Sequence, residues 1–291
     1  MATGLKQING YTYYFGKYGD LLSGWMHIDG EDYYFDTPDG NTSRARMITG
    51  WYTIGDTLYY FDESGKRAHS WQLIDNSWYY FNDDGIMQTG WQQISGKWYY
   101  LNKDGNMFTG WLPGLGGTWY YLEPNGSMAT GWKELIGKWY YFNASGARTT
   151  GWVLVNDNWY YLDESGAMLT GWLEINGHSY YLEPTGRMST GWKMIDNTWY
   201  YFNDNGSMAT GWVLVNGNWY YLDESGAMLT GWVLDDGIWY YLNSNGSMAT
   251  GWILDNGTWY YLNNDGSMVT GSKKINGKTY NFDTNGRCTN P

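Results

Sequence analysis

Residues 211–230 read GWVLVNGNWYYLDESGAMLT, and this stretch decides how the chain folds. Residues 212–215 and 219–222 are rich in aromatic and branched apolar side chains, which favour β-strands. Asn216-Gly217 between them tolerates the positive φ angles of a type I′ turn, which joins two antiparallel strands. Residues 223–226 form a second turn signal before the next Gly-Trp pair. The stretch therefore predicts one β-hairpin and a connecting loop.

The same unit recurs along the chain with a period of 20 residues. The single step of 21 residues is explained by one extra residue in 113–117, and the step of 26 residues by extra residues between Thr37 and Arg46. Leu5 and Ser272 keep the spacing without the tryptophan. The marker tryptophans are Trp25, Trp51, Trp71, Trp91, Trp111, Trp132, Trp152, Trp172, Trp192, Trp212, Trp232 and Trp252.

One hairpin of this length cannot bury a core alone, so the units are predicted to stack on one another as a solenoid. Glycine and Asn-Gly pairs interrupt every window before a stable helix is complete. The predicted fold is all-β, with about fourteen stacked 20-residue hairpin repeats.

Composition narrows the classes of partner. The formal net charge of −12 and the pI near 4.5 argue against nucleic acid and favour a cationic ligand. No apolar run approaches a membrane span of about 20 residues. The chain opens without a targeting segment, so we expect that an export signal was removed and that Met1 is an added start residue. The single cysteine, Cys288, is expected to be incidental.

The aromatic residues suggest a binding site at each junction between hairpins. Side chains alternate along a strand, so Trp219 and Tyr221 share one face and Tyr220 projects from the other. Two tryptophans of one unit and the first tyrosine of the next can then form a three-walled box for a quaternary ammonium ion. Rings worth about 0.5–2 kcal/mol each give a box of about 2–6 kcal/mol, near millimolar affinity. The alternative is that these rings only pack, as we expect for Tyr221.

The units read GW, then WYYL, then G-x-M-x-TGW, and over residues 4–290 they resemble the choline-binding repeats of Gram-positive surface proteins. The resemblance implies a left-handed β-solenoid with choline held between consecutive hairpins by two Trp, one Tyr and often a Met. It also implies a secreted protein attached to the wall surface through choline or phosphocholine on teichoic and lipoteichoic acids. No cofactor is implied.

Carried onto this sequence, the resemblance predicts nine complete boxes. They are Trp71, Trp78 and Tyr99; Trp91, Trp98 and Tyr120; Trp111, Trp119 and Tyr140; Trp132, Trp139 and Tyr160; Trp152, Trp159 and Tyr180; Trp192, Trp199 and Tyr220; Trp212, Trp219 and Tyr240; Trp232, Trp239 and Tyr260; and Trp252, Trp259 and Tyr280. Loop methionines such as Met87, Met107, Met128, Met208 and Met248 either close the fourth side or only pack.

Departures from the pattern predict weak or absent choline sites. Asp32, Leu58 and Ser179 replace the second tryptophan, and Arg67 and Arg148 replace the methionine. These departures divide the chain into degenerate repeats over 1–66, with Arg44 and Arg46 in the longer loop, and consensus repeats over 67–291. The first part is expected to be a specialised face that does not anchor the protein.

Catalysis is not expected. His27, His69 and His178 lack metal-ligand spacing, and acidic pairs such as Asp62-Glu63 and Asp163-Glu164 fall in the repeated turns. The first hypothesis is a repeat-only surface protein, acting as an adhesin or as a modulator of a wall lytic enzyme, with a host protein or a wall hydrolase as partner. The alternatives are a glucan-binding repeat module and the detached anchor of an autolysin or phage lysin.

Overall fold

The computed structural model describes residues 1–37, 40 and 44–291. The regular structure of these residues is almost entirely β-strand, which confirms the all-β class. The chain divides into two compact units, Met1–Thr149 and Thr150–Pro291. Among the described residues no helix is both long and apolar enough to span a membrane.

The first unit is a series of antiparallel hairpins, with one additional short strand on the second hairpin and a 3-10 turn in the sixth. Its strands are β1 (Gly4–Ile8) with β2 (Tyr11–Phe15); β3 (Gly24–Ile28) with β4 (Glu31–Asp36) and β5 (Arg46–Met47); β6 (Gly50–Ile54) with β7 (Thr57–Phe61); β8 (Ser70–Ile74) with β9 (Ser77–Phe81); β10 (Gly90–Ile94) with β11 (Lys97–Leu101); β12 (Gly110–Pro113), followed by η2 (Leu115–Gly117), with β13 (Trp119–Leu122); and β14 (Gly131–Leu135) with β15 (Lys138–Phe142).

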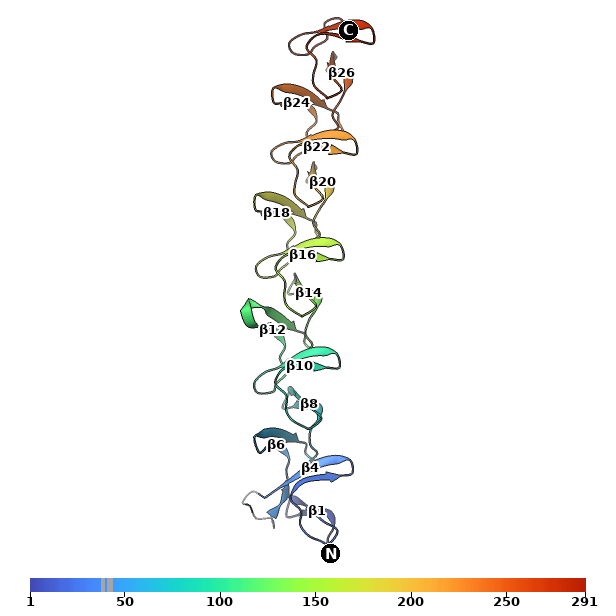
Figure 1. Ribbon diagram of the computed structural model, residues 1–291. Coiled ribbons are helices and arrows are strands. Elements are labelled where there is room, and N and C mark those ends of the chain that lie inside the picture. The colour runs from blue at the N-terminus through green and yellow to red at the C-terminus, as the bar shows by residue number, and fades with distance from the viewer. Residues whose placement is uncertain (38–39, 41–43) are drawn as a thin grey trace. The chain divides into compact units, whose positions relative to one another are not determined.

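The second unit repeats the same hairpin without additions, and Figure 1 shows its labelled strands following one another in chain order. Its strands are β16 (Gly151–Val155) with β17 (Asn158–Leu162); β18 (Gly171–Ile175) with β19 (His178–Leu182); β20 (Gly191–Ile195) with β21 (Thr198–Phe202); β22 (Gly211–Val215) with β23 (Asn218–Leu222); β24 (Gly231–Asp235) with β25 (Ile238–Leu242); β26 (Gly251–Asp255) with β27 (Thr258–Leu262); and β28 (Gly271–Ile275) with β29 (Lys278–Phe282).

The turn within each hairpin follows the sequence signal. Asn216 and Gly217 have φ angles of 51° and 79°, as a type I′ turn requires. Ile136 occupies the Asn216 position in its own hairpin with a φ of 52°, a conformation that is strained for a β-branched residue. The insertion at 113–117 falls in the corresponding turn, where η2 replaces the two-residue connection.

One deeply buried position recurs in most hairpins, and further buried residues such as Ala68 and Ile74 pack around it in places. In most hairpins the residue of the second strand that pairs with the glycine opening the first strand, such as Leu222, is completely buried. We expected Tyr221 to be core, but it is only half-buried, and the fully buried position is the next one along the strand. The members of this set are Phe35, Phe61, Phe81, Leu101, Leu122, Phe142, Leu162, Leu182, Phe202, Leu222, Leu242 and Leu262.

Consecutive hairpins are joined by a backbone hydrogen bond from the connecting loop. The Met228 amide donates to the Trp199 carbonyl of the preceding hairpin at 2.8 Å, while Met228 also bridges to Leu222 of its own hairpin. The Met228 side chain fills the space beside Gly246, where a Cβ atom would lie 2.3 Å from the sulfur. The turn glycine is therefore required by this contact as well as by its positive φ.

The longer loop near the N-terminus is only partly described, because residues 38–39 and 41–43 of the predicted insertion lie outside the described residues. Its end forms β5, which pairs with β4. The Arg46 guanidinium carbon lies 3.9 Å from the centre of the Tyr11 ring, a cation–π contact. This loop residue thus packs on the first hairpin.

Candidate functional site

The two faces of each hairpin carry different side chains. In the β22–β23 pair, Trp212 is opposite Tyr221 and Leu214 is opposite Trp219. Opposed residues of an antiparallel pair project from the same face, so Trp212, Trp219 and Tyr221 share one face and Tyr220 lies on the other. The register therefore agrees with the predicted alternation.

At the junction with the next hairpin, three aromatic rings come together. The Trp212 and Trp219 ring centres are 6.4 Å apart and their planes are nearly perpendicular, at 87°. Tyr240, on the second strand of the next hairpin, lies 4.8 Å from Trp212 at 68°. Three mutually inclined rings from two hairpins form a concave aromatic wall, which we call a cage.

Eight of the nine predicted boxes repeat this geometry. Trp–Trp centre distances are 6.0–6.4 Å and Trp–Tyr distances are 4.7–5.1 Å. These boxes begin at Trp71, Trp91, Trp111, Trp152, Trp192, Trp212, Trp232 and Trp252. The ninth box, Trp132, Trp139 and Tyr160, takes residues from both units and stays a prediction.

Several cages enclose open cavities of small-molecule size. The Trp212 cage has a cavity of about 370 Å³, lined also by Met248, Asn264 and Asp265. Further cavities of about 280–370 Å³ lie in the cages that begin at Trp91, Trp232 and Trp252. The second tryptophan is partly open to solvent, with Trp219 41% exposed. A ligand can therefore reach the rings from outside.

The fourth wall is a methionine in the Trp91, Trp212 and Trp232 cages. The Met248 amide donates to the Trp219 carbonyl at 2.7 Å, and its side chain lines that cavity. Met128 and Met268 occupy the same place in the Trp91 and Trp232 cages. At the last junction the Cys288 amide makes the equivalent hydrogen bond to the Trp259 carbonyl at 2.8 Å, while Pro291 lines the cavity. We expected Cys288 to be incidental, and this expectation was wrong. Cys288 occupies the methionine position of the repeat and packs against the core cluster that contains Phe282.

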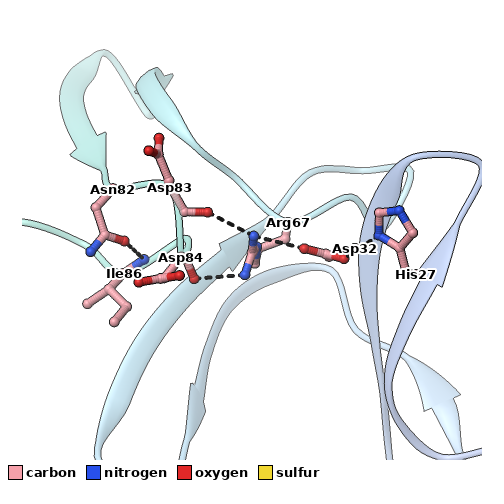
Figure 2. Close-up of polar contacts among 7 residues, drawn as sticks. All are labelled: His27, Asp32, Arg67, Asn82, Asp83, Asp84 and Ile86. Carbon is pink, nitrogen blue, oxygen red and sulfur yellow. Dashed lines mark hydrogen bonds and ion pairs between the residues drawn. The ribbon is translucent and has the colours of Figure 1, made fainter.

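One junction in the degenerate repeats is filled by the protein's own cation (Figure 2). Asp32 stands where other hairpins have the second tryptophan, and its carboxylate pairs with the Arg67 guanidinium at 2.8 Å and with His27 at 2.7 Å. Arg67 also donates to the carbonyls of Asp84 and Asp83 at 2.8 and 3.0 Å. Its guanidinium carbon lies 5.6 Å from the Trp25 ring. A cationic side chain thus makes the contacts with aromatic and acidic groups at this junction.

Other departures leave the junction incomplete. Trp172 and Tyr200 lie 5.0 Å apart with Ser179 in place of the second ring, and Trp51 and Tyr79 lie 4.9 Å apart at the junction where Leu58 replaces it. Arg148 occupies the methionine position of the Trp111 cage, where its backbone amide donates a hydrogen bond to the Trp119 carbonyl at 2.8 Å. Weak choline binding at these junctions remains a prediction.

Two groups of cage residues were missed by the sequence reasoning. The first group comes from the turn that lies two hairpins further along the chain. Asn264 and Asp265 of that turn form the rim of the Trp212 cage. The other group is acidic: the Trp212 indole nitrogen donates to the Asp235 carboxylate at 3.0 Å, and Tyr221 donates to it at 3.1 Å. An acid at a position that is aliphatic in most units was a signal available in the sequence.

The acidic groups affect neighbouring tyrosines. Burial raises the pKa of Tyr240, a wall of the Trp212 cage, and the charges of Asp235, Asp265 and Asp236 raise it further. Burial and the hydrogen bond to Asp235 likewise raise the pKa of Tyr221. Negative charge gathered around an aromatic cage favours a cation inside it. Among the described residues, no group of three His, Cys, Asp or Glu side chains is arranged to hold a metal ion.

Comparisons with known proteins agree with this architecture. A choline-binding repeat model matches residues 2–46, 68–92, 88–130, 129–170, 189–231 and 229–270, and a cell wall binding repeat model matches 49–66 and 170–188. No curated protein sequence matches the chain.

Three similar proteins of known structure come from Streptococcus pneumoniae. CbpJ is 35% identical, with 85% of this chain and 100% of that chain covered and a TM-score of 0.59. Choline binding protein F is 32% identical, with coverages of 100% and 99% and a TM-score of 0.56. The modular autolysin LytC is 31% identical over 76% of this chain and 52% of its own length, with a TM-score of 0.51. The chain belongs to the choline-binding repeat family.

Proposed function

We propose that this chain is a non-catalytic surface protein that binds choline or phosphocholine of wall teichoic acids through its aromatic cages. Membership of the family indicates choline and cell-wall binding. The observation that supports the cages is the repeated arrangement of two indoles and a phenol around an open cavity, as at Trp212, Trp219 and Tyr240. Three inclined rings with carboxylates such as Asp235 and Asp265 beside them suit a diffuse cation.

We further propose that the hairpins stack as a left-handed solenoid of about fourteen repeats and that the protein is secreted and held on the wall surface. A single cage of about 2–6 kcal/mol binds in the millimolar range. Several cages on one choline-decorated polymer raise the overall affinity by orders of magnitude through effective concentration. The array as a whole is then the anchor, with repeats 67–291 carrying it and repeats 1–66 forming a separate face.

The test of this function is calorimetric titration and thermal unfolding with choline chloride, with matched sodium chloride and dextran as controls. Ligand that binds only the folded state at a hundredfold excess over its dissociation constant stabilises it by about 2.7 kcal/mol per site. We expect several equivalents of choline and a large choline-specific rise in melting temperature. A shift with dextran and none with choline would instead support a glucan-binding module.

A matched pair of variants ties the binding to the rings. Trp219→Ala removes one cage wall that is 41% exposed, and Leu214→Ala removes its cross-strand neighbour, which is 57% exposed. We expect Trp219→Ala to lower the choline stoichiometry by one and Leu214→Ala to leave it unchanged. Equal stoichiometry in both variants would contradict the assignment of this cage.

The biological role beyond attachment is proposed to involve a wall hydrolase or a host protein. This chain covers 99% of choline binding protein F, which was crystallised in the presence of a peptidoglycan analogue. Co-sedimentation of a purified wall hydrolase with the choline-loaded protein on isolated walls tests the modulator role. Adhesion of protein-coated beads to host cells tests the adhesin role.

A further inference from the structure

Two neighbouring cages have the same aromatic walls but rims of opposite charge. The cavity of the Trp212 cage is lined at its rim by Asn264 and Asp265. The cavity of the Trp232 cage is lined at the equivalent positions by Thr284 and Asn285, and two residues further by Arg287. A ligand that carries only a cation and a ligand that also carries a phosphate would meet different surroundings in these two sites.

The inner parts of the two cages are closely matched. Trp212 donates to Asp235 at 3.0 Å, and Trp232 donates to Asp255 at 3.1 Å. The Trp–Trp centre distances are both 6.4 Å. Each cage therefore has the same rings and a carboxylate bonded to its first indole, so the cation-binding part does not distinguish them.

The carboxylate at the rim of the first cage is held ionised. The Asp265 carboxylate accepts hydrogen bonds from the Ser267 hydroxyl at 2.6 Å and the Ser267 amide at 3.0 Å. These hydrogen bonds lower the pKa of Asp265. Asn245 makes the same two contacts with Ser247 at 2.8 and 3.1 Å. The turn therefore needs an oxygen acceptor at this position but not a charge.

A third cage supplies a neutral reference. The Trp91 cage has Met128 as its fourth wall and Ser145 at its rim, in the place of Asp265. Its Trp–Trp and Trp–Tyr distances, 6.4 and 5.0 Å, are close to the 6.4 Å and 4.7–4.8 Å of the other two. It differs from them in its inner part, because Gly114 stands at the repeat position of Asp235. The three cages thus form a series with a negative, a neutral and a positive rim.

We propose that rim charge sets the ligand preference of individual cages: Arg287 makes the Trp232 cage favour phosphocholine, and Asp265 makes the Trp212 cage favour a quaternary ammonium ion without a phosphate. The proposal rests on the proposed function, because it assigns ligands to cages of that function. The ammonium group occupies the rings in both cases. A phosphate at neutral pH carries about 1.5–2 negative charges and extends from the ammonium towards the rim.

The expected difference in affinity between the cages follows from the strength of interactions between partly exposed charges. An interaction between partly exposed charges is worth about 0.2–1 kcal/mol, which corresponds to a factor of about 1.4 to 5 in affinity. The ratio of the dissociation constants for phosphocholine and choline cancels the shared ammonium contribution. Relative to the Trp91 cage, we expect this ratio to be about 1.4- to 5-fold higher at the Trp212 cage and lower by a similar factor at the Trp232 cage.

Methionine methyl NMR can measure the cages one by one in the full chain, because Met128, Met248 and Met268 each line one of the three cavities. The signals are assigned by replacing each methionine with leucine. Titrations with choline chloride and with phosphocholine then give two constants for each cage. Sodium chloride at 1 M, where the screening length is about 3 Å, should reduce the differences between cages.

Two charge-removing variants complete the test. Asp265→Asn keeps the turn contacts seen at Asn245, and it should move the ratio at Met248 towards that of the Trp91 cage. Arg287→Gln should do the same at Met268 and leave Met248 unchanged. Ratios that agree within about 1.5-fold in all three cages at low salt, or that ignore these variants, would overturn the proposal. If no methyl group responds to either ligand, the proposed function itself fails.

Discussion

Replacing Arg67 with methionine tests whether the protein's own cation stabilises the second junction of the chain. Methionine is the residue at this position in most units. The substitution leaves the backbone hydrogen bond from the residue 67 amide to the Asp32 carbonyl, at 2.8 Å, in place. The Arg67 stem packs against Gly85 much as methionines pack against other turn glycines. The substitution therefore removes mainly the guanidinium contacts.

The expected loss can be worked from those contacts. Two hydrogen bonds from a charged donor, to Asp84 and Asp83, contribute about 1.5 kcal/mol each, and the ion pair with Asp32 and the contact with Trp25 add about 0.5–1 kcal/mol each. The Arg67 side chain is 20% exposed and Asp32 is 33% exposed, so solvent screens part of this. We expect Arg67→Met to cost about 2–4 kcal/mol of local stability.

Hydrogen-exchange mass spectrometry of peptides covering 24–36 and 57–67 measures this local stability. Arg187→Met is the matched control, because that arginine lies exposed in a turn. Protection should fall in Arg67→Met only, and saturating choline should not restore it. In the double variant Asp32→Trp with Arg67→Met, which rebuilds the missing indole and methionine, choline should restore protection. Equal protection in Arg67→Met and Arg187→Met would refute the reasoning.

Three further predictions follow from single residues. Ser179→Trp supplies the missing ring beside Trp172, which is 46% exposed, so the number of bound choline molecules should rise by one in calorimetry, and an unchanged number would contradict this. Ile136→Asn should stabilise the protein by about 0.5–1 kcal/mol in denaturant titration, because the side chain is fully exposed at a φ of 52° and asparagine tolerates that conformation. Burial and the hydrogen bond to Asp36 raise the pKa of Tyr52 to about 12, so the folded state keeps a proton that the unfolded state releases near pH 10. Stability contributed by this proton is present below pH 10 and lost as pH rises through 12, and Tyr52→Phe should remove that part of the pH dependence.

The repeated hairpin could be predicted from the sequence because its causes are local. The Asn-Gly turn, the strand residues on either side and the 20-residue period each act within one unit. The alternation that puts Trp212 and Trp219 on one face and Tyr220 on the other is a property of any strand. The residue-by-residue assignment of the cage walls came from the resemblance to choline-binding repeats.

The rim of each cage could not be predicted in this way. Asp265 reaches the cage of Trp212 from two hairpins further along the chain, and that approach depends on the rotation between successive hairpins. The bond between the Trp212 indole and Asp235 likewise depends on how closely two hairpins approach. The 20-residue period of the sequence gives neither the rotation between successive hairpins nor the distance between them.

The sequence by itself determined the repeating hairpin and the strand faces on which its aromatic residues lie, because turn chemistry and strand alternation act over a few residues. Only the tertiary structure decided which junctions stay open and which charges surround them. Arg67 shows the difference: its position in the repeat marks a departure, but its pairing with Asp32 depends on the distance between side chains of different hairpins. Contacts between hairpins are set by packing, which a linear pattern does not contain.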